Sequence, residues 1–264
     1  MKKYLVIGKP IDHSLSPQLH NHWIKKYNIE AIYEKKEIND VEIKTLIEEE
    51  KKKKIDGINV TVPYKKTVIP YLDQLSFEAN ATQSVNTIYF DKEKIIGHNT
   101  DIEGFETSIK KTKYDILNKE VFILGSGGVV PSIIFALNRM KVSKIIISNR
   151  TRSKGENLKK LFKNLTVVDW GEIPKFDIVI NATSLGLNKD DIINLDFSKS
   201  GNDKFFYDII YNPNETNFLK TAKELGNYTE NGKKMFIYQA SAAFKIWHEI
   251  EPIIDDDVVK LLDK

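Results

Sequence analysis

Short apolar runs alternate with amphipathic runs along the chain, and this pattern predicts strands that alternate with helices. In the first hundred residues, apolar runs at 4–8, 31–36 and 57–62 predict strands, whereas 16–27 and 40–54 have helical patterns. The runs "SVNTIYF" and "KIIGHNTD" follow, and they predict a hairpin or strand pair. Ser16 is expected to be the N-cap of the first helix, with Pro17 at its first helical position.

A second series of strands and helices follows in the rest of the chain. Its predicted strands are "EVFILG", "SKIIISNR", "FDIVINAT" and "KFFYDIIY", and its predicted helices are "GGVVPSIIFALNRM" and residues 153–162. The last long segment, "MFIYQASAAFKIWHEI", is strongly helical. Strands that alternate with helices imply parallel βαβ units, so the expected fold class is α/β with two domains.

The composition is that of an ordinary globular protein, and it narrows the possible functions. Of 264 residues, 41% are hydrophobic and 29% are charged, and the length allows one large domain or two modest ones. A net charge of +3 is too small to indicate nucleic-acid binding. The chain has no cysteine, which excludes disulfides, thiolate metal sites and a cysteine nucleophile, and which fits a reducing compartment.

The N-terminal run "MKKYLVIG" is expected to form a strand, because its apolar part is too short for a signal peptide. No stretch approaches the roughly 20 apolar residues that are needed to cross a bilayer. We therefore expect a cytoplasmic protein with no membrane partner.

A glycine-rich turn lies directly between a predicted strand and a predicted helix. In "VFILGSGGVVPS", Gly125, Gly127 and Gly128 would allow a tight turn and let backbone N–H groups approach a pyrophosphate. The spacing is G-x-G-G rather than the full G-x-G-x-x-G. The strand–turn–helix context favours a bound dinucleotide, and the alternative is a glycine-rich turn without a ligand.

The end of the next predicted strand indicates which dinucleotide would bind. An NAD site has an acidic residue there for the ribose 2′-hydroxyl, whereas this chain has "SNRTRSK" with Arg150, Arg152 and Lys154. Arginine side chains match the geometry of a phosphate, so the loop favours NADP. The alternative is a solvated basic loop.

Polar side chains also gather in the first half of the chain, before and within the predicted helix at 16–27. Ser14 and Ser16 could cap the helix or present hydroxyls to a polyhydroxylated ligand, and the residues alone leave these alternatives even. No Cys or HExxH pattern accompanies His13, His20 and His22, so no metal site is expected.

Further polar groups stand at the ends of predicted strands. Thr61 and Lys65 leave the strand at 57–62, and Asn86 and residues 99–101 flank the predicted strand pair. In open α/β sheets, ligands bind in the crevice outside the carboxyl ends of the strands. We expect these groups to converge there.

In combination, these motifs resemble those of the shikimate dehydrogenase family. The resemblance covers essentially the whole chain and rests on the order and spacing of "GKPIDHSLSP", "NVTVPYK", "SVNT", "NTD", "GSGG", "NRT", "NATSLG", "DIIYNPNET" and "MFIYQASAAF". It implies the reversible, NADP-linked reduction of 3-dehydroshikimate to shikimate on the route to chorismate and the aromatic amino acids. It also implies an active site in a cleft between two α/β domains.

The resemblance divides the chain into three segments. Residues 1–103 would form an N-terminal α/β substrate-binding catalytic domain, and residues 104–234 a Rossmann-type NADP-binding domain. Residues 235–264 would form C-terminal helices that return to the first domain. The expected ligands are NADP and shikimate or 3-dehydroshikimate, and the expected assembly is a monomer or homodimer.

The resemblance also assigns site residues by matching positions. Lys65 and Asp101 match the catalytic pair. The matching substrate-binding positions are Ser14, Ser16, Thr61, Asn86, Tyr211 and Gln239. The matching cofactor-binding positions are Gly125, Ser126, Gly127, Gly128, Val129, Asn149, Arg150, Thr151, Arg152, Ser153, Lys154, Ile209 and Gly232.

Ketone reduction is chemistry that suits Lys65. Negative charge builds on the carbonyl oxygen as hydride arrives at carbon, and a lysine ammonium can stabilise that charge and supply the proton. Lys65 and Asp101 are expected to act as a coupled proton-relay pair. Two alternatives stay open: a quinate/shikimate dehydrogenase of broader specificity that uses NAD or NADP, and a non-catalytic metabolite-binding regulator.

Overall fold

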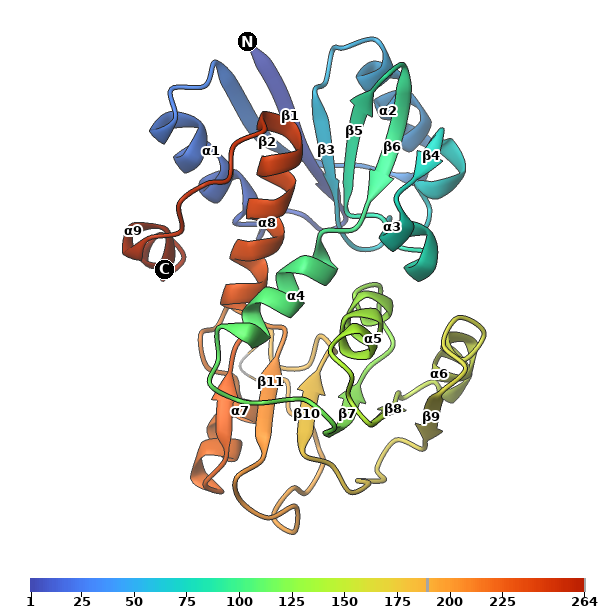
Figure 1. Cartoon of the computed structure of the whole chain (residues 1–264), viewed down its shortest axis with the longest axis vertical. Helices are drawn as coiled ribbons and strands as arrows, with labels where there is room; N and C mark the ends of the chain where they lie inside the picture. The colour runs from blue at the N-terminus through green and yellow to red at the C-terminus, as the bar shows by residue number, and fades with distance from the viewer. Residues whose placement is uncertain (189, 264) are drawn as a thin grey trace. The chain divides into compact units, whose positions relative to one another are not determined.

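The computed structural model describes residues 1–188 and 190–263, which divide into two compact units. The first unit comprises Met1–Gly104 and Ile237–Lys264, and the second comprises Phe105–Phe236. Within the described residues, each unit contains one six-stranded sheet (Figure 1). Helices α4 (Asp101–Lys110) and α8 (Lys233–His248) contain the two points where the chain passes from one unit to the other.

The first unit is built on a mixed sheet with the strand order β2-β1-β3-β5-β6-β4. β1 is parallel to β2 and β3, whereas β5 is antiparallel to both β3 and β6. The β5–β6 pair confirms the hairpin predicted from the two adjacent apolar runs. The strands are β1 (Lys2–Gly8), β2 (Ala31–Glu37), β3 (Gly57–Val60), β4 (Gln74–Leu75), β5 (Thr87–Asp91) and β6 (Lys94–His98).

Helix α1 (Ser16–Lys26) connects β1 to β2, and its start differs from the prediction. The predicted N-cap at Ser16 is wrong, because Leu15 occupies the N-cap position and Ser16 is already helical. Ser14 Oγ accepts a hydrogen bond of 3.3 Å from the Ser16 backbone N–H. The Ser16 hydroxyl lies near the Tyr33 hydroxyl, so its neighbour is a residue of the sheet rather than the start of its own helix.

The helical segment predicted at 40–54 is divided and shorter. A 3-10 turn, η1 (Asp40–Glu42), precedes α2 (Ile43–Lys51), because Asn39 and Glu42 form a reciprocal capping box. Glu42 Oε2 accepts a hydrogen bond of 2.9 Å from the Asn39 backbone N–H. The remaining helical segments of this unit are η2 (Ile69–Tyr71), α3 (Phe77–Thr82) and α9 (Asp256–Lys260).

The C-terminal part of the chain returns to the first unit, as predicted, and α8 lies against its sheet (Figure 1). Trp247 Nε1 donates a hydrogen bond of 3.1 Å to the Ile88 carbonyl of β5. A Cβ atom at Gly57 would lie 2.3 Å from Trp247 Nε1. Glycine at position 57 therefore leaves the space on β3 that the indole ring occupies.

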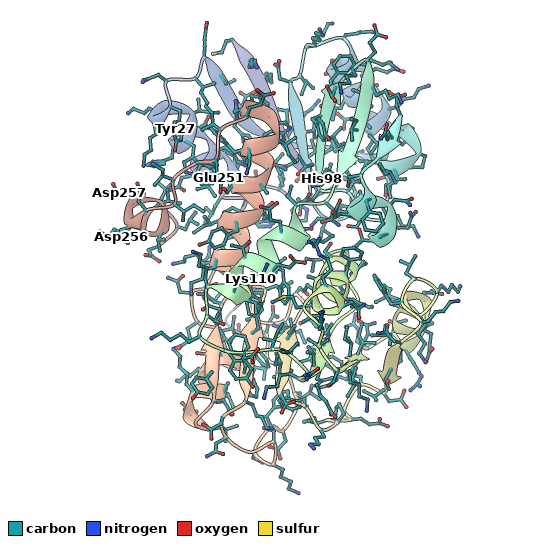
Figure 2. All side chains as sticks on the ribbon, in the orientation of Figure 1. Tyr27, His98, Lys110, Glu251, Asp256 and Asp257 are labelled. Carbon is teal, nitrogen blue, oxygen red and sulfur yellow. The ribbon has the colours of Figure 1, made fainter. Side chains whose placement is uncertain are left out.

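The segment after α8 is tied to α1. Lys26 Nζ lies 2.5 Å from Asp255 Oδ2, and the Ile253 backbone N–H donates a hydrogen bond of 2.8 Å to the Tyr27 hydroxyl. Figure 2 labels Tyr27 together with Asp256, the first residue of α9. These contacts join the C-terminal segment of the chain to the end of α1.

The second unit has a fully parallel sheet with the order β12-β11-β10-β7-β8-β9. This is the doubly wound Rossmann order, and β7 and β10 flank the point where the strand order reverses. The strands are β7 (Glu120–Leu124), β8 (Lys144–Ser148), β9 (Leu165–Val168), β10 (Ile178–Asn181), β11 (Phe205–Asp208) and β12 (Tyr228–Glu230). The helices are α5 (Val130–Arg139), α6 (Arg152–Leu158) and α7 (Asn217–Glu224).

The described part of the chain contains neither a membrane-spanning helix nor a cluster of metal-ligating side chains. No helix in residues 1–188 or 190–263 has both the length and the apolar character to span a membrane. In the same residues, no group of three or more His, Cys, Asp and Glu side chains is placed to hold a metal ion.

Glu50, on the buried face of α2, is a carboxyl inside the core of the first unit. It is fully buried, and within the described residues neither carboxyl oxygen has a hydrogen-bond partner. Burial raises the pKa of Glu50 to about 8, and the negative charge of Asp56 adds to the effect. The group is therefore expected to be mainly protonated at neutral pH.

We predict that Glu50→Met stabilises the protein in alkaline solution. A carboxyl whose folded pKa is raised contributes stability that is complete below its unfolded pKa and is lost as pH rises through about 8. Methionine has no charge to bury, so the gain at pH 9 is on the order of a few kcal/mol. Urea unfolding between pH 5 and pH 9 measures it, with Glu48→Met on the exposed face of α2 as control. Equal pH dependence in wild type and Glu50→Met would contradict the prediction.

Candidate active site

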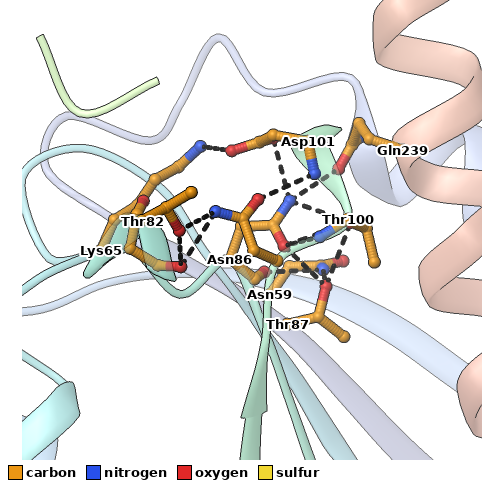
Figure 3. Close-up of polar contacts among 10 residues, drawn as sticks. Asn59, Lys65, Thr82, Asn86, Thr87, Thr100, Asp101 and Gln239 are labelled. Atoms are coloured by element: carbon orange, nitrogen blue, oxygen red, sulfur yellow. Dashed lines mark hydrogen bonds and ion pairs between the residues drawn. The ribbon is translucent and has the colours of Figure 1, made fainter. Parts of the chain in front are cut away.

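Lys65 and Asp101 form a nearly buried ion pair in the first unit. Lys65 follows β3 and Asp101 is the first residue of α4, and their side chains are 12% and 7% exposed. Lys65 Nζ donates a hydrogen bond to Asp101 Oδ2 (Figure 3). The helix dipole favours a carboxylate in the first turn of a helix. Because little water reaches the pair, its attraction is screened less than that of a surface ion pair.

Asn86 binds the other carboxylate oxygen of Asp101. Its Nδ2 donates hydrogen bonds of 2.9 Å to Asp101 Oδ1 and to Thr100 Oγ1. Its Oδ1 accepts a hydrogen bond of 2.8 Å from the Thr100 backbone N–H. Gln239 Oε1, from α8, lies 3.4 Å from Asn86 Nδ2. Lys65, Asp101, Asn86 and Gln239, which the resemblance assigned to one site, therefore do lie together.

The neighbouring Tyr64 is anchored in the core of the first unit. Tyr64 is 2% exposed, and its hydroxyl donates a hydrogen bond of 2.6 Å to the Ile38 carbonyl. The backbone carbonyl of Lys65 accepts a hydrogen bond of 2.8 Å from the Val85 N–H. With Tyr64 anchored on one side, the Lys65 ammonium reaches Asp101, whereas Lys66 is exposed.

Thr61 lies immediately after β3, at the carboxyl end of this parallel strand. It is half-buried, and its backbone carbonyl accepts a hydrogen bond of 2.9 Å from Tyr64 N–H. A Cβ atom at Gly8, the last residue of β1, would lie 2.5 Å from Thr61 Cγ2. Glycine at position 8 therefore allows Thr61 to pack at the edge where β1 and β3 end, which is where ligands bind in such sheets.

Ser14 and Ser16 have structural partners in the first unit. Ser14 Oγ accepts a hydrogen bond from the Ser16 backbone N–H, and the Ser16 hydroxyl lies near the Tyr33 hydroxyl. Tyr33 in turn donates a hydrogen bond of 2.7 Å to Asn59 Oδ1. Burial raises the pKa of Tyr33 well above its usual value, so the phenol stays neutral. The serines are thus part of a polar network that continues into the sheet.

The glycine turn of the second unit contains two kinds of glycine. Gly125 has φ +104°, and a Cβ atom there would lie 2.7 Å from the Ala182 carbonyl oxygen, so no other residue fits without strain. Gly127 is exposed, and the nearest atom to a Cβ there would be 3.9 Å away. The chain continues through Val129, the N-cap of α5.

Ser126 gives this turn the features of a phosphate site. Its Oγ is buried and has no hydrogen-bond partner in the described residues. Buried hydroxyls are normally paired, so an unpaired one next to a helix N-terminus indicates a missing acceptor or donor. The open position at Gly127 leaves space for a ligand to approach the backbone. These features fit the pyrophosphate of a dinucleotide.

The basic loop after β8 has one cation that is already neutralised. Arg152 Nη1 lies 2.6 Å from Asp169 Oδ1, and Arg152 Nη2 lies 3.5 Å from Glu156 Oε1. The hydrogen bond that Arg152 donates to Asp169 raises the pKa of Arg152. Arg150 and Lys154 are exposed, and within the described residues their side chains have no hydrogen bond or ion pair.

Two other predicted cofactor-binding residues, Asn149 and Thr151, stabilise the backbone conformation of this loop. Asn149 Nδ2 donates a hydrogen bond of 2.9 Å to the Thr151 carbonyl. Thr151 is the N-cap of α6, and Ser153 lies exposed in its first turn. The loop thus presents Arg150 and Lys154 to solvent, while Arg152 connects α6 to the end of β9.

Three further predicted residues come from the segments around β11 and β12. A Cβ atom at Gly232 would lie 2.0 Å from the Ile209 carbonyl oxygen, and Gly232 N–H donates a hydrogen bond of 3.0 Å to the Ile210 carbonyl. Ile209 and Gly232 therefore lie together. Tyr211 stacks on Phe236, with ring centroids 4.5 Å apart, and belongs to the second unit.

Asp208 organises the same region, and the sequence analysis did not single it out. It is fully buried, and its carboxylate accepts hydrogen bonds from Thr216 Oγ1, Ile210 N–H and Asn181 Nδ2, at 2.7, 3.0 and 3.1 Å. Burial raises the pKa of Asp208 to about 6, although these hydrogen bonds oppose the shift. The sequence feature that could have indicated Asp208 is the polar residue at the end of each of the buried runs "IVIN" and "FFYD".

Two family models match the chain. Residues 6–88 match the model described as "Shikimate dehydrogenase substrate binding domain". Residues 107–222 match the model described as "Shikimate / quinate 5-dehydrogenase".

Individual relatives match over almost the full length. The protein named "Shikimate dehydrogenase (NADP(+))" from Pelagibacter ubique is 57% identical over 262 residues, which cover 99% of each chain. A crystal structure of shikimate dehydrogenase from Aquifex aeolicus is 37% identical, with a TM-score of 0.91 and coverage of 99% and 97%. A shikimate dehydrogenase crystallised in complex with NADP+ is 32% identical, with a TM-score of 0.90 and coverage of 100% and 93%.

We predict different effects for two alanine substitutions in the glycine turn. Gly125→Ala lowers the unfolding temperature of the second unit, because φ +104° and the Ala182 carbonyl leave no place for a methyl group. Gly127→Ala leaves the unfolding temperature nearly unchanged but weakens NADP binding severalfold, because the methyl group occupies the open position. Thermal unfolding and calorimetric NADP titration measure both effects. Wild-type NADP affinity in Gly127→Ala would contradict the phosphate assignment.

Proposed function

Because the chain belongs to the shikimate dehydrogenase family, we propose that it catalyses the reversible, NADP-linked interconversion of 3-dehydroshikimate and shikimate. The observation that carries this proposal is the nearly buried Lys65–Asp101 pair, which lies among polar groups at strand ends in the first unit. Relatives that match over the full length have the same activity in their names. The fold alone would not identify the substrate, since proteins with one fold catalyse many different reactions.

Lys65 would act on the carbonyl oxygen of the substrate. NADPH, when bound, supplies the hydride that reduces the ring ketone. As negative charge develops on the oxygen, the Lys65 ammonium would stabilise it and transfer one proton to it, giving the alcohol. In the reverse direction, neutral Lys65 would accept the proton of the hydroxyl. Asp101 would hold the ammonium in place and share the proton with it as a coupled pair.

The remaining first-unit residues would bind the substrate's hydroxyl and carboxylate groups. Ser14, Ser16 and Thr61 carry hydroxyls, and Asn86 and Gln239 carry amides, which can each donate and accept hydrogen bonds. Tyr211, which the resemblance assigns to substrate binding, would offer a phenol hydroxyl. The first unit would thus be the substrate-binding catalytic domain.

The second unit would bind the cofactor. The turn at Gly125–Gly128 would hold the pyrophosphate, and Ser126 Oγ would gain the partner that it lacks in the described residues. Arg150 and Lys154 would bind the 2′-phosphate, because their charges are not already paired. Arg152 would act chiefly on the position of the loop, through Asp169.

Location and assembly belong to the same proposal. A cytoplasmic enzyme is expected from the composition, and a biosynthetic, NADPH-linked reduction fits that compartment. A monomer or a homodimer would serve the reaction equally, since each chain carries all of the proposed residues.

A second candidate is a dehydrogenase that also accepts quinate. The description of the matching catalytic model names both shikimate and quinate, which favours testing this substrate. The paired hydroxyls of Ser14 and Ser16 and the basic loop at Arg150 favour shikimate and NADP. A non-catalytic regulator that keeps the fold has less support, because the Lys65–Asp101 pair is intact.

We predict the outcome of a matrix of substrates and cofactors. Shikimate and quinate are each assayed with NADP+ and NAD+, and reduced nicotinamide is followed by its absorbance. The combination of shikimate and NADP+ should give the highest kcat/KM, by at least about tenfold. Comparable rates with quinate or NAD+ would support the broader enzyme. No turnover in any combination would support the regulator and end the proposal.

We also predict that Lys65→Ala removes the chemical step. Loss of the proton donor and of the cation next to the developing charge should lower kcat by about a hundredfold or more. NADP binding should stay nearly unchanged, because the residues that would bind it are in the second unit. Stopped-flow hydride transfer and calorimetric NADP titration measure the two quantities.

Lys66→Ala is the matched control for this prediction. Lys66 is the adjacent lysine and is exposed, so its removal changes the net charge equally but should leave kcat nearly unchanged. Near-normal turnover in Lys65→Ala, or equal losses in both variants, would end the catalytic assignment of Lys65.

A further inference from the structure

Two buried amides and one buried threonine connect the sheet to the Lys65–Asp101 pair. Asn59 on β3 and Thr87 on β5 are direct partners in the antiparallel register of these strands. Asn59 Nδ2 lies 3.1 Å from Thr87 Oγ1, and Thr87 Oγ1 lies 3.1 Å from Asn86 Oδ1 (Figure 3). Thr87 is fully buried, and Asn59 and Asn86 are 7% and 3% exposed. Water is therefore excluded from competing for these hydrogen bonds.

Backbone groups fix the orientation of both amides. The backbone carbonyl of Asn86 can only accept a hydrogen bond, so the Asn59 side-chain atom 3.0 Å from it must be Nδ2. The Thr100 N–H can only donate, so the Asn86 atom 2.8 Å from it must be Oδ1. The assignment of nitrogen and oxygen thus follows from the backbone rather than from a choice between two amide rotamers.

These two orientations determine what the Thr87 hydroxyl does. It faces Nδ2 of Asn59, which can only donate, and Oδ1 of Asn86, which can only accept. The hydroxyl therefore accepts from Asn59. Its oxygen has a shorter contact with Asn86 Oδ1, at 3.1 Å, than with Thr100 Oγ1, at 3.3 Å, so we assign the donated hydrogen bond to Asn86. With its oxygen held in this way, Asn86 directs Nδ2 toward Asp101 Oδ1, at 2.9 Å.

We propose that Thr87 is a positioning residue for the reaction, which acts through the Asn86 amide on Asp101 and thereby on Lys65; this inference rests on the proposed function. Within the described residues, Thr87 Oγ1 makes no hydrogen bond with Lys65 or Asp101, so its effect passes through Asn86. If the amide rotates, its oxygen faces a carboxylate oxygen, and the two repel each other. The hydroxyl of Thr87 opposes this rotation.

Thr87→Val and Thr87→Ser separate positioning from packing. Valine keeps the volume of threonine and removes the hydroxyl, whereas serine keeps the hydroxyl and removes the methyl group. Thr87→Val should lower the single-turnover hydride-transfer rate about ten- to a hundredfold, with a smaller change in the KM for shikimate. Thr87→Ser should have nearly wild-type activity although its unfolding temperature is lowered. A purely structural role would give the opposite order, with activity following stability.

Further variants keep the test decisive. If Thr87→Val does not fold, Thr87→Ala replaces it. Thr87→Ala and Thr87→Ser then form the matched pair, because alanine and serine differ only by the hydroxyl group. Ser108→Ala controls for the loss of a buried hydroxyl as such: Ser108 Oγ contacts Tyr207 Oη at 2.9 Å in the second unit, and this variant should leave hydride transfer nearly unchanged.

The wild-type protein distinguishes the two possible failures. If wild type does not oxidise shikimate, the proposed function is wrong and the inference falls with it. If wild type is active and a hydroxyl-free Thr87 variant transfers hydride at the wild-type rate, the positioning role is wrong and the proposed function stands.

Discussion

The ion pair between Lys65 and Asp101 is the interaction on which the polar part of the first unit depends. Moving two charges out of water costs several kcal/mol for each ion, and attraction alone compensates for this only when the remaining polar atoms are also satisfied. Both carboxylate oxygens of Asp101 have partners, one from Lys65 and one from Asn86. The density of asparagine and threonine around the pair follows from this requirement.

The proposed cofactor site of the second unit relies on backbone geometry rather than on a buried ion pair. Its parallel sheet brings the glycine turn and the basic loop to the carboxyl ends of β7 and β8, where dinucleotides bind in this fold. Gly125 and Gly232 are glycines because another chain segment approaches closely, whereas the position of Gly127 is open. The three glycines therefore have two different physical reasons, although the sequence alone does not distinguish them.

Most of the main elements could be predicted from the hydrophobic pattern, because burial on one face depends on local spacing. The errors were at termini, in short elements, and in the helices α4 and α7, which the sequence analysis did not predict. Ser16 is not the N-cap of α1, since the helix already includes it and Leu15 takes the cap position. The segment at 40–54 is divided by the capping box of Asn39. Short elements such as α3, β9 and β12 contain too few residues to show a period.

The sequence by itself determined the α/β alternation, the glycine turn, the basic loop and the family motifs, because each depends on neighbours in the chain. Only the tertiary structure decided which polar groups meet. Thr87 pairs with Asn59, and Arg152 is neutralised by Asp169. Glu50 is buried, although in the sequence it looks like the other charged residues of its helix. Hydrogen-bond partners and burial depend on segments that are far apart in sequence, so the local spacing of residues cannot predict them.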